Sequence, residues 1–211
     1  MADKFVCDTP EVREFIGNVK DCIARGSSIQ ERLALIRPYF DQMLSKPDWL
    51  PEEYRRTLES GGMGKGIANW LLYRDTEGTL SLAALVMPPG IATPVHDHLA
   101  WGLVGLYSGE QDEEVYETAA PVGVEDQHAD LKLVNTNHIV KGSFYELIPP
   151  TGDIHRVTTT GDLSSISLHL LANDIGCVLR HTFTPETGEI TPFLSRYSNY
   201  DCEAGGRRTP P

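Results

Sequence analysis

Several features are scarce or missing from this sequence. No apolar run approaches the roughly 20 residues needed to span a bilayer, and the stretch after Met1 soon turns polar, unlike a signal peptide. The 211 residues hold only four cysteines, none in a Cys-x-x-Cys pair, which argues against a zinc knuckle or a disulfide framework. Basic residues are outnumbered, and the net charge of -12 argues against binding to nucleic acid or anionic membranes. We therefore predict a cytoplasmic chain with reduced thiols.

The N-terminal part carries helix signals. Thr9 can cap a helix that has Pro10 at its first position, and an apolar stripe follows. Ser28 and Glu31 form a capping box for a second helical run. Pro38 lies within that run, so we expect a break or a kink there. None of these residues points to chemistry, and the segment is expected to pack on a sheet.

From about residue 67 the pattern changes to short strands separated by turn residues. The expected strands are Ile67–Arg74, Leu80–Met87, Thr93–His98, Gly102–Tyr107, Val115–Thr118, Leu131–Val134, Phe144–Ile148, His155–Thr159, Ser164–Leu171 and Val178–Phe183. Many short strands without interleaved helices predict an all-β sandwich or barrel. The predicted organisation is a helical segment over 1–60, a barrel over 61–200 and a flexible tail over 201–211, with the chain from Tyr197 onward loosely held.

Three histidines are the strongest functional signal. Side chains alternate across a strand, so His96 and His98 project from one face and form half of a metal site. A turn through Gly152 delivers His155. Imidazoles suit Fe(II), Zn(II), Cu(II) and Ni(II), and three protein ligands leave coordination positions open, as a catalytic site requires. The alternative is a cluster of hydrogen-bonded histidines that holds no metal.

The spacing around these histidines resembles a known family. Gly90, His96-x-His98 and Gly109 resemble the first cupin motif, and the stretch 142–155 resembles the second. Further segments resemble the bacterial cysteine dioxygenase type I group, nearest the 3-mercaptopropionate dioxygenases: Thr93–His98, Trp101–Gly105, Gly152–Val157, Ser165–His169, Pro192–Ser195 and Tyr197–Asn199. The resemblance implies an all-β cupin (jelly-roll) barrel with an N-terminal helical segment.

The same resemblance implies one Fe(II) per chain held by His96, His98 and His155. Gly102 stands where many cupins have a metal-binding glutamate, and its absence is the pattern of thiol dioxygenases. A site of three neutral ligands keeps more positive charge on the metal and favours an anion such as a thiolate. Coordination would also lower the thiol pKa. The hypothesis is that a small thiol and O2 give a sulfinic acid, with no nucleic acid, membrane or protein partner.

Ser167, His169 and Leu171 alternate along one expected strand and therefore share a face. In the resembling enzymes this strand carries a Ser-His-Tyr network, so Ser167 and His169 are implied catalytic residues, while Leu171 replaces the tyrosine. A satisfied core histidine is the alternative for His169. A hydroxyl from another strand could substitute, with Tyr73, Tyr107 and Tyr145 as candidates. With Gly102 and Leu171 at the relevant positions, we expect no Cys-Tyr thioether.

Substrate contacts are implied for two residues. Asn69 stands where the resembling cysteine enzymes have an arginine and the mercaptopropionate enzymes a glutamine. Arg180 matches an arginine implicated in carboxylate binding, and a guanidinium suits a bidentate carboxylate. The alternative for Arg180 is a solvated surface pair. The acidic run 110–114 is expected to be a wet face, Asp97 to make structural hydrogen bonds, and Cys177 to be a small core residue.

Three other functions remain open at this stage. One is a cysteine dioxygenase, and the second is a cupin dioxygenase that cleaves a C–C bond in a non-thiol substrate. The third is a non-catalytic sensor of a metal or small ligand, suggested by the missing tyrosine at Leu171.

Overall fold

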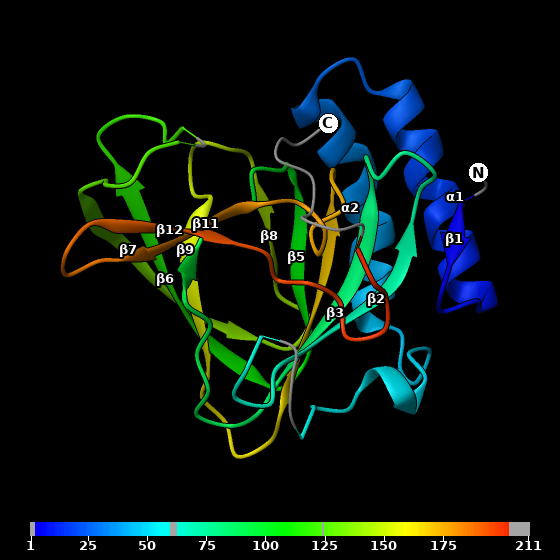
Figure 1. The fold of residues 1–211 in the computed structure, drawn as a ribbon. Coiled ribbons are helices and arrows are strands. Elements are labelled where there is room, and N and C mark those ends of the chain that lie inside the picture. The colour runs from blue at the N-terminus through cyan, green and yellow to red at the C-terminus, as the bar shows by residue number, and fades with distance from the viewer. Residues whose placement is uncertain (1–2, 60–62, 124, 203–211) are drawn as a thin grey trace.

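The structure, a computed structural model, describes residues 3–59, 63–123 and 125–202. Its core consists of two six-stranded antiparallel sheets (Figure 1). The first has the order β1-β2-β3-β10-β5-β8, with bounds Lys4–Phe5, Ala68–Arg74, Ser81–Met87, Ser165–Leu171, Gly102–Ser108 and Phe144–Leu147. The second has the order β12-β11-β4-β9-β6-β7, with bounds Glu189–Phe193, Arg180–Thr184, Val95–His96, Ile154–Thr159, Glu110–Thr118 and Leu131–Val140.

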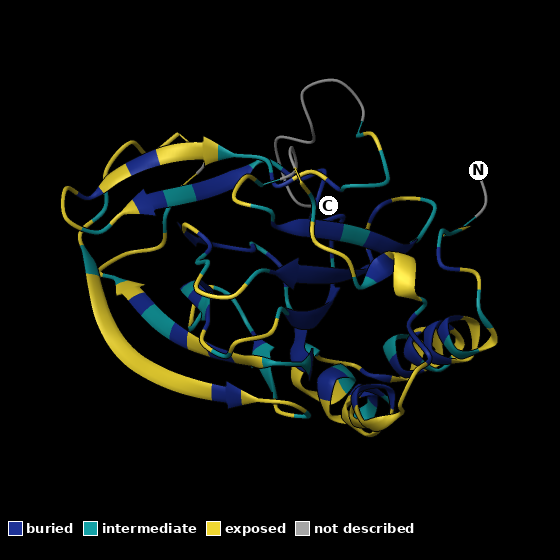
Figure 2. Cartoon of the chain, turned by 90° about the horizontal axis from the view of Figure 1, so that it is seen from below, coloured by how far each residue is buried: buried dark blue, intermediate teal, exposed yellow. Residues whose placement is uncertain are grey.

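Two helices cover the outer face of the first sheet. Helix α1 spans Pro10–Arg25 and α2 spans Ile29–Ser45, and each begins at the predicted cap, Thr9 or Ser28. Figure 2 shows that both helices turn exposed residues outward while the strands beside them are buried. A Cβ at Gly105 of β5 would lie 2.5 Å from Leu44 Cδ1, so the glycine permits the close approach of α2. The architecture confirms the predicted all-β cupin barrel with an N-terminal helical segment.

Of the break or kink expected at Pro38, the break is ruled out, because α2 continues through Pro38 as one helix. Proline removes one backbone donor, whereas α2 buries five apolar side chains against the core: Leu33, Ile36, Phe40, Met43 and Leu44. A single 3-10 turn, η1 (Glu52–Tyr54), follows. In the part of the chain that the structure describes, no helix is long and apolar enough to cross a membrane.

The strand predictions erred at the edges of the sheets and in β4, which is shorter than expected, and β6, which begins five residues earlier. No strand was predicted at β1 or β12, each of which pairs with one strand among the described residues. Strand β7 extends to Val140, although its residues are mostly exposed and lack the alternation that marks a half-buried strand. Central strands such as β3 and β10 are buried throughout and were placed to within one residue at each end.

The C-terminal segment corrects two expectations. Tyr197 is buried, and its hydroxyl donates to Asp174 at 2.8 Å, so the chain is not loosely held at Tyr197. Cys202 forms a disulfide with Cys177, with a Cα–Cα distance of 5.3 Å, which contradicts the prediction that all four thiols are reduced. The sequence could not show this pairing, since the two residues meet only through the fold. Cys7 and Cys22 are free and buried; residues 203–211 of the predicted tail lie outside the described residues.

Candidate metal centre

The barrel brings the three predicted histidines together. His96 on β4 and His155 on β9 are paired residues of neighbouring strands, and His98 follows two residues after His96. The candidate ligand atoms of the three rings all lie within 4.8 Å of one another, and all three residues are buried. A left-handed conformation at Leu99, with φ of 53°, turns the chain immediately after the pair. The local spacing and the strand pairing therefore converge on one point.

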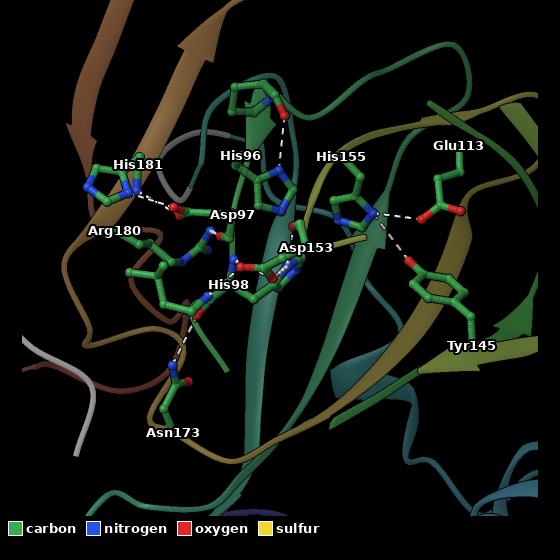
Figure 3. Close-up of polar contacts among 12 residues, drawn as sticks. His96, Asp97, His98, Glu113, Tyr145, Asp153, His155, Asn173, Arg180 and His181 are labelled. Carbon is green, nitrogen blue, oxygen red and sulfur yellow. Dashed lines mark hydrogen bonds and ion pairs between the residues drawn. The ribbon is translucent and has the colours of Figure 1, made fainter. Parts of the chain in front are cut away.

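Hydrogen bonds fix how each imidazole is presented (Figure 3). His96 Nδ1 contacts Pro94 O at 3.0 Å. His98 Nδ1 contacts Asp153 Oδ1 at 3.2 Å, and His155 Nδ1 contacts Glu113 Oε1 at 2.8 Å. Because these oxygens can only accept, each Nδ1 carries the proton and each Nε2 keeps its lone pair.

The Nε2 atoms of His98 and His155 are buried and have no hydrogen-bond partner. Buried polar atoms are normally paired, so unpaired acceptors at one point are the mark of a ligand site. Burial, together with the neighbouring histidines, also lowers the pKa of His96 and His98 well below the usual value. Both imidazoles are therefore neutral at physiological pH, as metal ligation requires. The donor set fits a divalent transition metal.

A small cavity of about 20 Å³ adjoins the histidines. That is room for about one water molecule. Its lining includes five residues that the sequence assigned to ligand, catalytic or substrate roles, together with apolar and hydroxyl side chains: His96, His98, His169, Arg180, Asn69, Met63, Leu85, Ile175 and Ser195. The fold thus gathers the metal, substrate and histidine candidates at one place.

His169 and Ser167 lie beside this centre on β10. Ser167 Oγ and His169 Nε2 are 3.0 Å apart, and the ring centroids of His169 and His98 are 6.3 Å apart. Burial, with added repulsion from His155 and Arg180, lowers the pKa of His169 to about 3. His169 is therefore a neutral, hydrogen-bonded side chain near the metal centre and a wall of the cavity.

Leu171 does not take the place of a catalytic hydroxyl. It is fully buried in an apolar cluster that includes Val104 and Ile175. Gly102 is its paired residue on β5, and a Cβ at Gly102 would lie 2.1 Å from Leu170 O and 2.7 Å from Leu171 Cδ2. Neither a carboxylate nor a cysteine side chain fits at position 102 without movement of β10.

The alternative interpretation of Arg180, as a solvated residue in a surface ion pair, is wrong. It is 3% exposed, and one of its Nη atoms donates to the carbonyl of Asp97. Its Nε is buried without a partner. Burial lowers its pKa to about 10, against the attraction of Asp97 and Asp153, so the guanidinium remains charged near neutral pH. A buried cation with a free donor beside a cavity is suited to bind an anion.

Asn69 reaches the same cavity, but part of its amide is already engaged. Its Nδ2 donates to Arg196 O at 2.7 Å, and its backbone N–H donates to Ser198 Oγ at 2.9 Å. Asn69 therefore ties the C-terminal segment to β2 as well as lining the cavity. The carboxylate of Asp97 accepts from the backbone N–H and Nδ1 of His181, which confirms the predicted hydrogen-bonding role.

Sequence reasoning missed Glu113. The acidic run on β6 was expected to be a wet face, yet Glu113 is 4% exposed and contacts His155. Along β6 the burial alternates, and Gln111 and Glu113 point inward while Glu110 and Asp112 point outward. Alternate residues of a strand share a face, so the inward orientation of Gln111 and Glu113 could have been expected from a strand at this position. Four acids within five residues concealed it, because they show no alternation of polarity. Tyr145, one of the tyrosines suggested by the sequence, lies 3.4 Å from His155 Nδ1, away from the converging Nε2 atoms.

Comparison with known proteins finds no family model that matches the chain. Similar solved structures include a Cupin 2 conserved barrel domain protein from Salinispora arenicola, at 13% identity over 61% of this chain and 91% of that chain, with a TM-score of 0.40. The two sheets and their strand order establish the architecture. This chain has the cupin fold.

Two enzymes also match in part. An acetylacetone dioxygenase from Acinetobacter johnsonii shares 14% identity over 72% of this cupin chain and 86% of its own, with a TM-score of 0.43. An oxalate decarboxylase from Lactobacillus farciminis shares 19% identity over 53% of this chain but only 30% of its own length, with a TM-score of 0.41. Similarities this distant carry no argument about activity, which depends on the site itself.

Proposed function

We propose that this cupin binds Fe(II) through His96, His98 and His155 and uses O2 to convert a small thiol carboxylate to its sulfinate. The observation that carries the proposal is the pairing of two features around one cavity. Three buried imidazoles direct their Nε2 atoms to one point, and the buried guanidinium of Arg180 has an unpaired donor. A substrate with an anionic tail and a metal-binding head would satisfy both, once the side chains that line the cavity of about 20 Å³ move apart to admit it.

The metal would supply the redox chemistry that joins the sulfur to O2. Histidine ligands do not by themselves select iron. The resemblance of the histidine motifs to the cysteine dioxygenase type I group supports both iron and a thiol. The lack of a ligating carboxylate supports an anionic substrate, since three neutral ligands leave the charge of the metal uncompensated.

Arg180 would hold the carboxylate of the substrate. Its free Nε–H is the available donor, and a charge-assisted contact in a buried site is stronger and more directional than one in water. The bond from Arg180 to the Asp97 carbonyl fixes the guanidinium before substrate arrives. Asn69 lines the same cavity and would contact the tail of the substrate.

The cavity favours a thiol acid without an amino group. Of the described residues that line it, none carries a carboxylate, and Met63, Leu85 and Ile175 are apolar. An α-ammonium group would be buried there without a counter-charge, which is costly. We therefore expect 3-mercaptopropionate to be a better substrate than cysteine.

Ser167 and His169 would orient the reacting groups. With its pKa lowered to about 3, His169 cannot act as a cationic acid near neutral pH. It can hold a hydrogen bond through Nε2, which Ser167 Oγ shares at 3.0 Å. Leu171 cannot donate, so the family role of the tyrosine hydroxyl has no equivalent at that position.

The test is oxygen uptake by iron-loaded protein with sulfinate quantified in parallel. The panel is 3-mercaptopropionate, cysteine, cysteamine and mercaptosuccinate. We expect coupled uptake and sulfinate formation, fastest with a thiol acid, and loss of both in His155→Ala. The exposed His138 provides a matched control, because His138→Ala removes an imidazole far from the cavity lining and should leave the rate unchanged. Stoichiometric iron without uptake on any thiol would contradict the proposal, and so would uptake without sulfinate, which would mean that the thiol is oxidised to another product.

A further inference from the structure

Glu113 contacts a metal-ligand candidate from behind and has no role in the reaction described above. We propose that Glu113 is a positioning residue: it holds His155 with Nε2 toward the metal and returns negative charge to a site that lacks a ligating carboxylate. The inference rests on the metal site of the proposed function. It concerns metal binding and not the identity of the substrate.

The geometry around Glu113 is closed on every side. Glu113 lies on β6, next to β9, which carries His155, and its Oε1 accepts from His155 Nδ1 at 2.8 Å. Its Oε2 accepts from Asn137 Nδ2 of β7 at 2.9 Å. Tyr145 of β8 adds its hydroxyl on the same side of the His155 ring (Figure 3). Three strands therefore hold one buried carboxylate against one imidazole.

Neither of the other two ligand candidates has so short a bond to a carboxylate. His96 Nδ1 contacts a neutral backbone carbonyl. His98 Nδ1 contacts Asp153, but that carboxylate also accepts two backbone N–H bonds, from His98 and Leu99, each at 3.0 Å. The bond between His155 and Glu113 is the shortest of the three Nδ1 contacts.

A carboxylate behind a ligating histidine raises the basicity of that ligand. The effect is greater for a ferric than for a ferrous ion, because the higher charge gains more from an electron-rich ligand. Position 102 cannot carry a carboxylate without displacing β10, since a Cβ there would be 2.1 Å from Leu170 O. The fold thus supplies negative charge from behind His155 instead of at the metal.

The experiment compares wild type with Glu113→Gln, which preserves size and can still accept from Nδ1 but removes the charge. Asn137 can turn its amide to present an oxygen to the new NH2 group. The control is Asp112→Asn on the same strand, which removes the same charge from an exposed carboxylate that contacts His138 and not His155. The probes are Co(II), titrated by its visible absorption, and the Fe(III)/Fe(II) couple. Melting of the metal-free proteins reports any structural loss separately.

We expect Glu113→Gln to weaken Co(II) binding by about 10- to 100-fold, with a higher iron reduction potential and unchanged metal-free melting. Each tenfold by which the ferric loss exceeds the ferrous loss raises the potential by about 59 mV. Asp112→Asn should change neither quantity. Equal changes in both variants, or wild-type affinity and potential in a folded Glu113→Gln, would overturn the inference.

A second variant keeps the test decisive if Glu113→Gln does not fold. Glu113→Asp keeps the charge but shortens the side chain and so loosens the bond to His155 Nδ1, and its Co(II) affinity should fall below that of wild type. Wild-type affinity in Glu113→Asp would then contradict the inference. None of these measurements needs a thiol. A wild-type protein that binds metal but oxidises no thiol would sink the proposed function alone, whereas one that binds no Co(II) would overturn both.

Discussion

Replacement of Arg180 by methionine should raise stability while it lowers activity. Arg180→Met keeps a long unbranched side chain in the cavity wall and removes the buried charge and its free Nε donor. The guanidinium also lies 4.7 Å from the ring centroid of Phe193, and a thioether can keep that contact with the ring. A substitution that raises stability and lowers activity identifies a residue that serves binding and not folding.

The expected magnitudes follow from burial. A pKa lowered from 12.5 to about 10 means that the fold disfavours the charged arginine, by about 3 kcal/mol. Loss of the bond to the Asp97 carbonyl offsets about 1 kcal/mol of the relief. The metal-free variant should therefore gain about 1–2 kcal/mol, which is a rise in Tm of about 2–8 °C for a domain of this size.

Activity should move the other way. Removal of one partner from a buried, hydrogen-bonded charge pair costs about 2–5 kcal/mol, so kcat/KM for 3-mercaptopropionate should fall by at least about 30-fold. Cysteamine has no carboxylate, so its turnover should change little. Arg156→Met is the control, because Arg156 pairs with Glu114 at the surface and does not line the cavity. A lower Tm together with unchanged kcat/KM for 3-mercaptopropionate would refute the assignment of Arg180 as the carboxylate site.

Three further predictions concern the scaffold. Burial lowers the pKa of His169 to about 3. Metal-free protein should therefore lose stability as pH falls from 6.5 toward 3, because only the unfolded state binds that proton. In His169→Gln, the slope of unfolding free energy against pH, measured by urea denaturation, should decrease by up to about 1.4 kcal/mol per pH unit. Cys202→Ser removes the disulfide that joins two residues 25 positions apart and should lower the free energy of thermal unfolding by about 3 kcal/mol. A reductant should destabilise wild type but have no effect on this variant. Gly102→Ala places a Cβ 2.1 Å from Leu170 O and should cost about 1–3 kcal/mol, while Gly161→Ala, with open space around it, should be close to neutral.

Local patterns in the sequence were sufficient for much of the fold and the metal centre. Strand β3 is marked by a run of apolar residues and β10 by alternating polar and apolar residues, each between turns. The capping residues Thr9 and Ser28 mark the helix starts. The spacing of His96 and His98 is local as well: His98 lies two residues beyond the end of β4, and its ring centroid is 4.9 Å from that of His96. These features needed no knowledge of distant contacts.

Features that depend on distant contacts were not predictable in the same way. Glu113 is separated from His155 by 42 residues, and its inward orientation was hidden within a run of acids. The pairing of Cys177 with Cys202 and the anchoring of Tyr197 arise from how the C-terminal segment crosses the barrel. Pro38 does not break α2, because burial of the apolar face of the helix outweighs one lost hydrogen bond.

Isotope labelling is the measurement that decides whether this cupin is a thiol dioxygenase. Iron-loaded protein would be given 3-mercaptopropionate under 18O2, and the product analysed by mass spectrometry. We predict a sulfinate in which both oxygens carry the label, formed by wild type and not by His155→Ala. A sulfinate with oxygen from water, or oxygen consumption without any sulfinate, would contradict the proposed reaction.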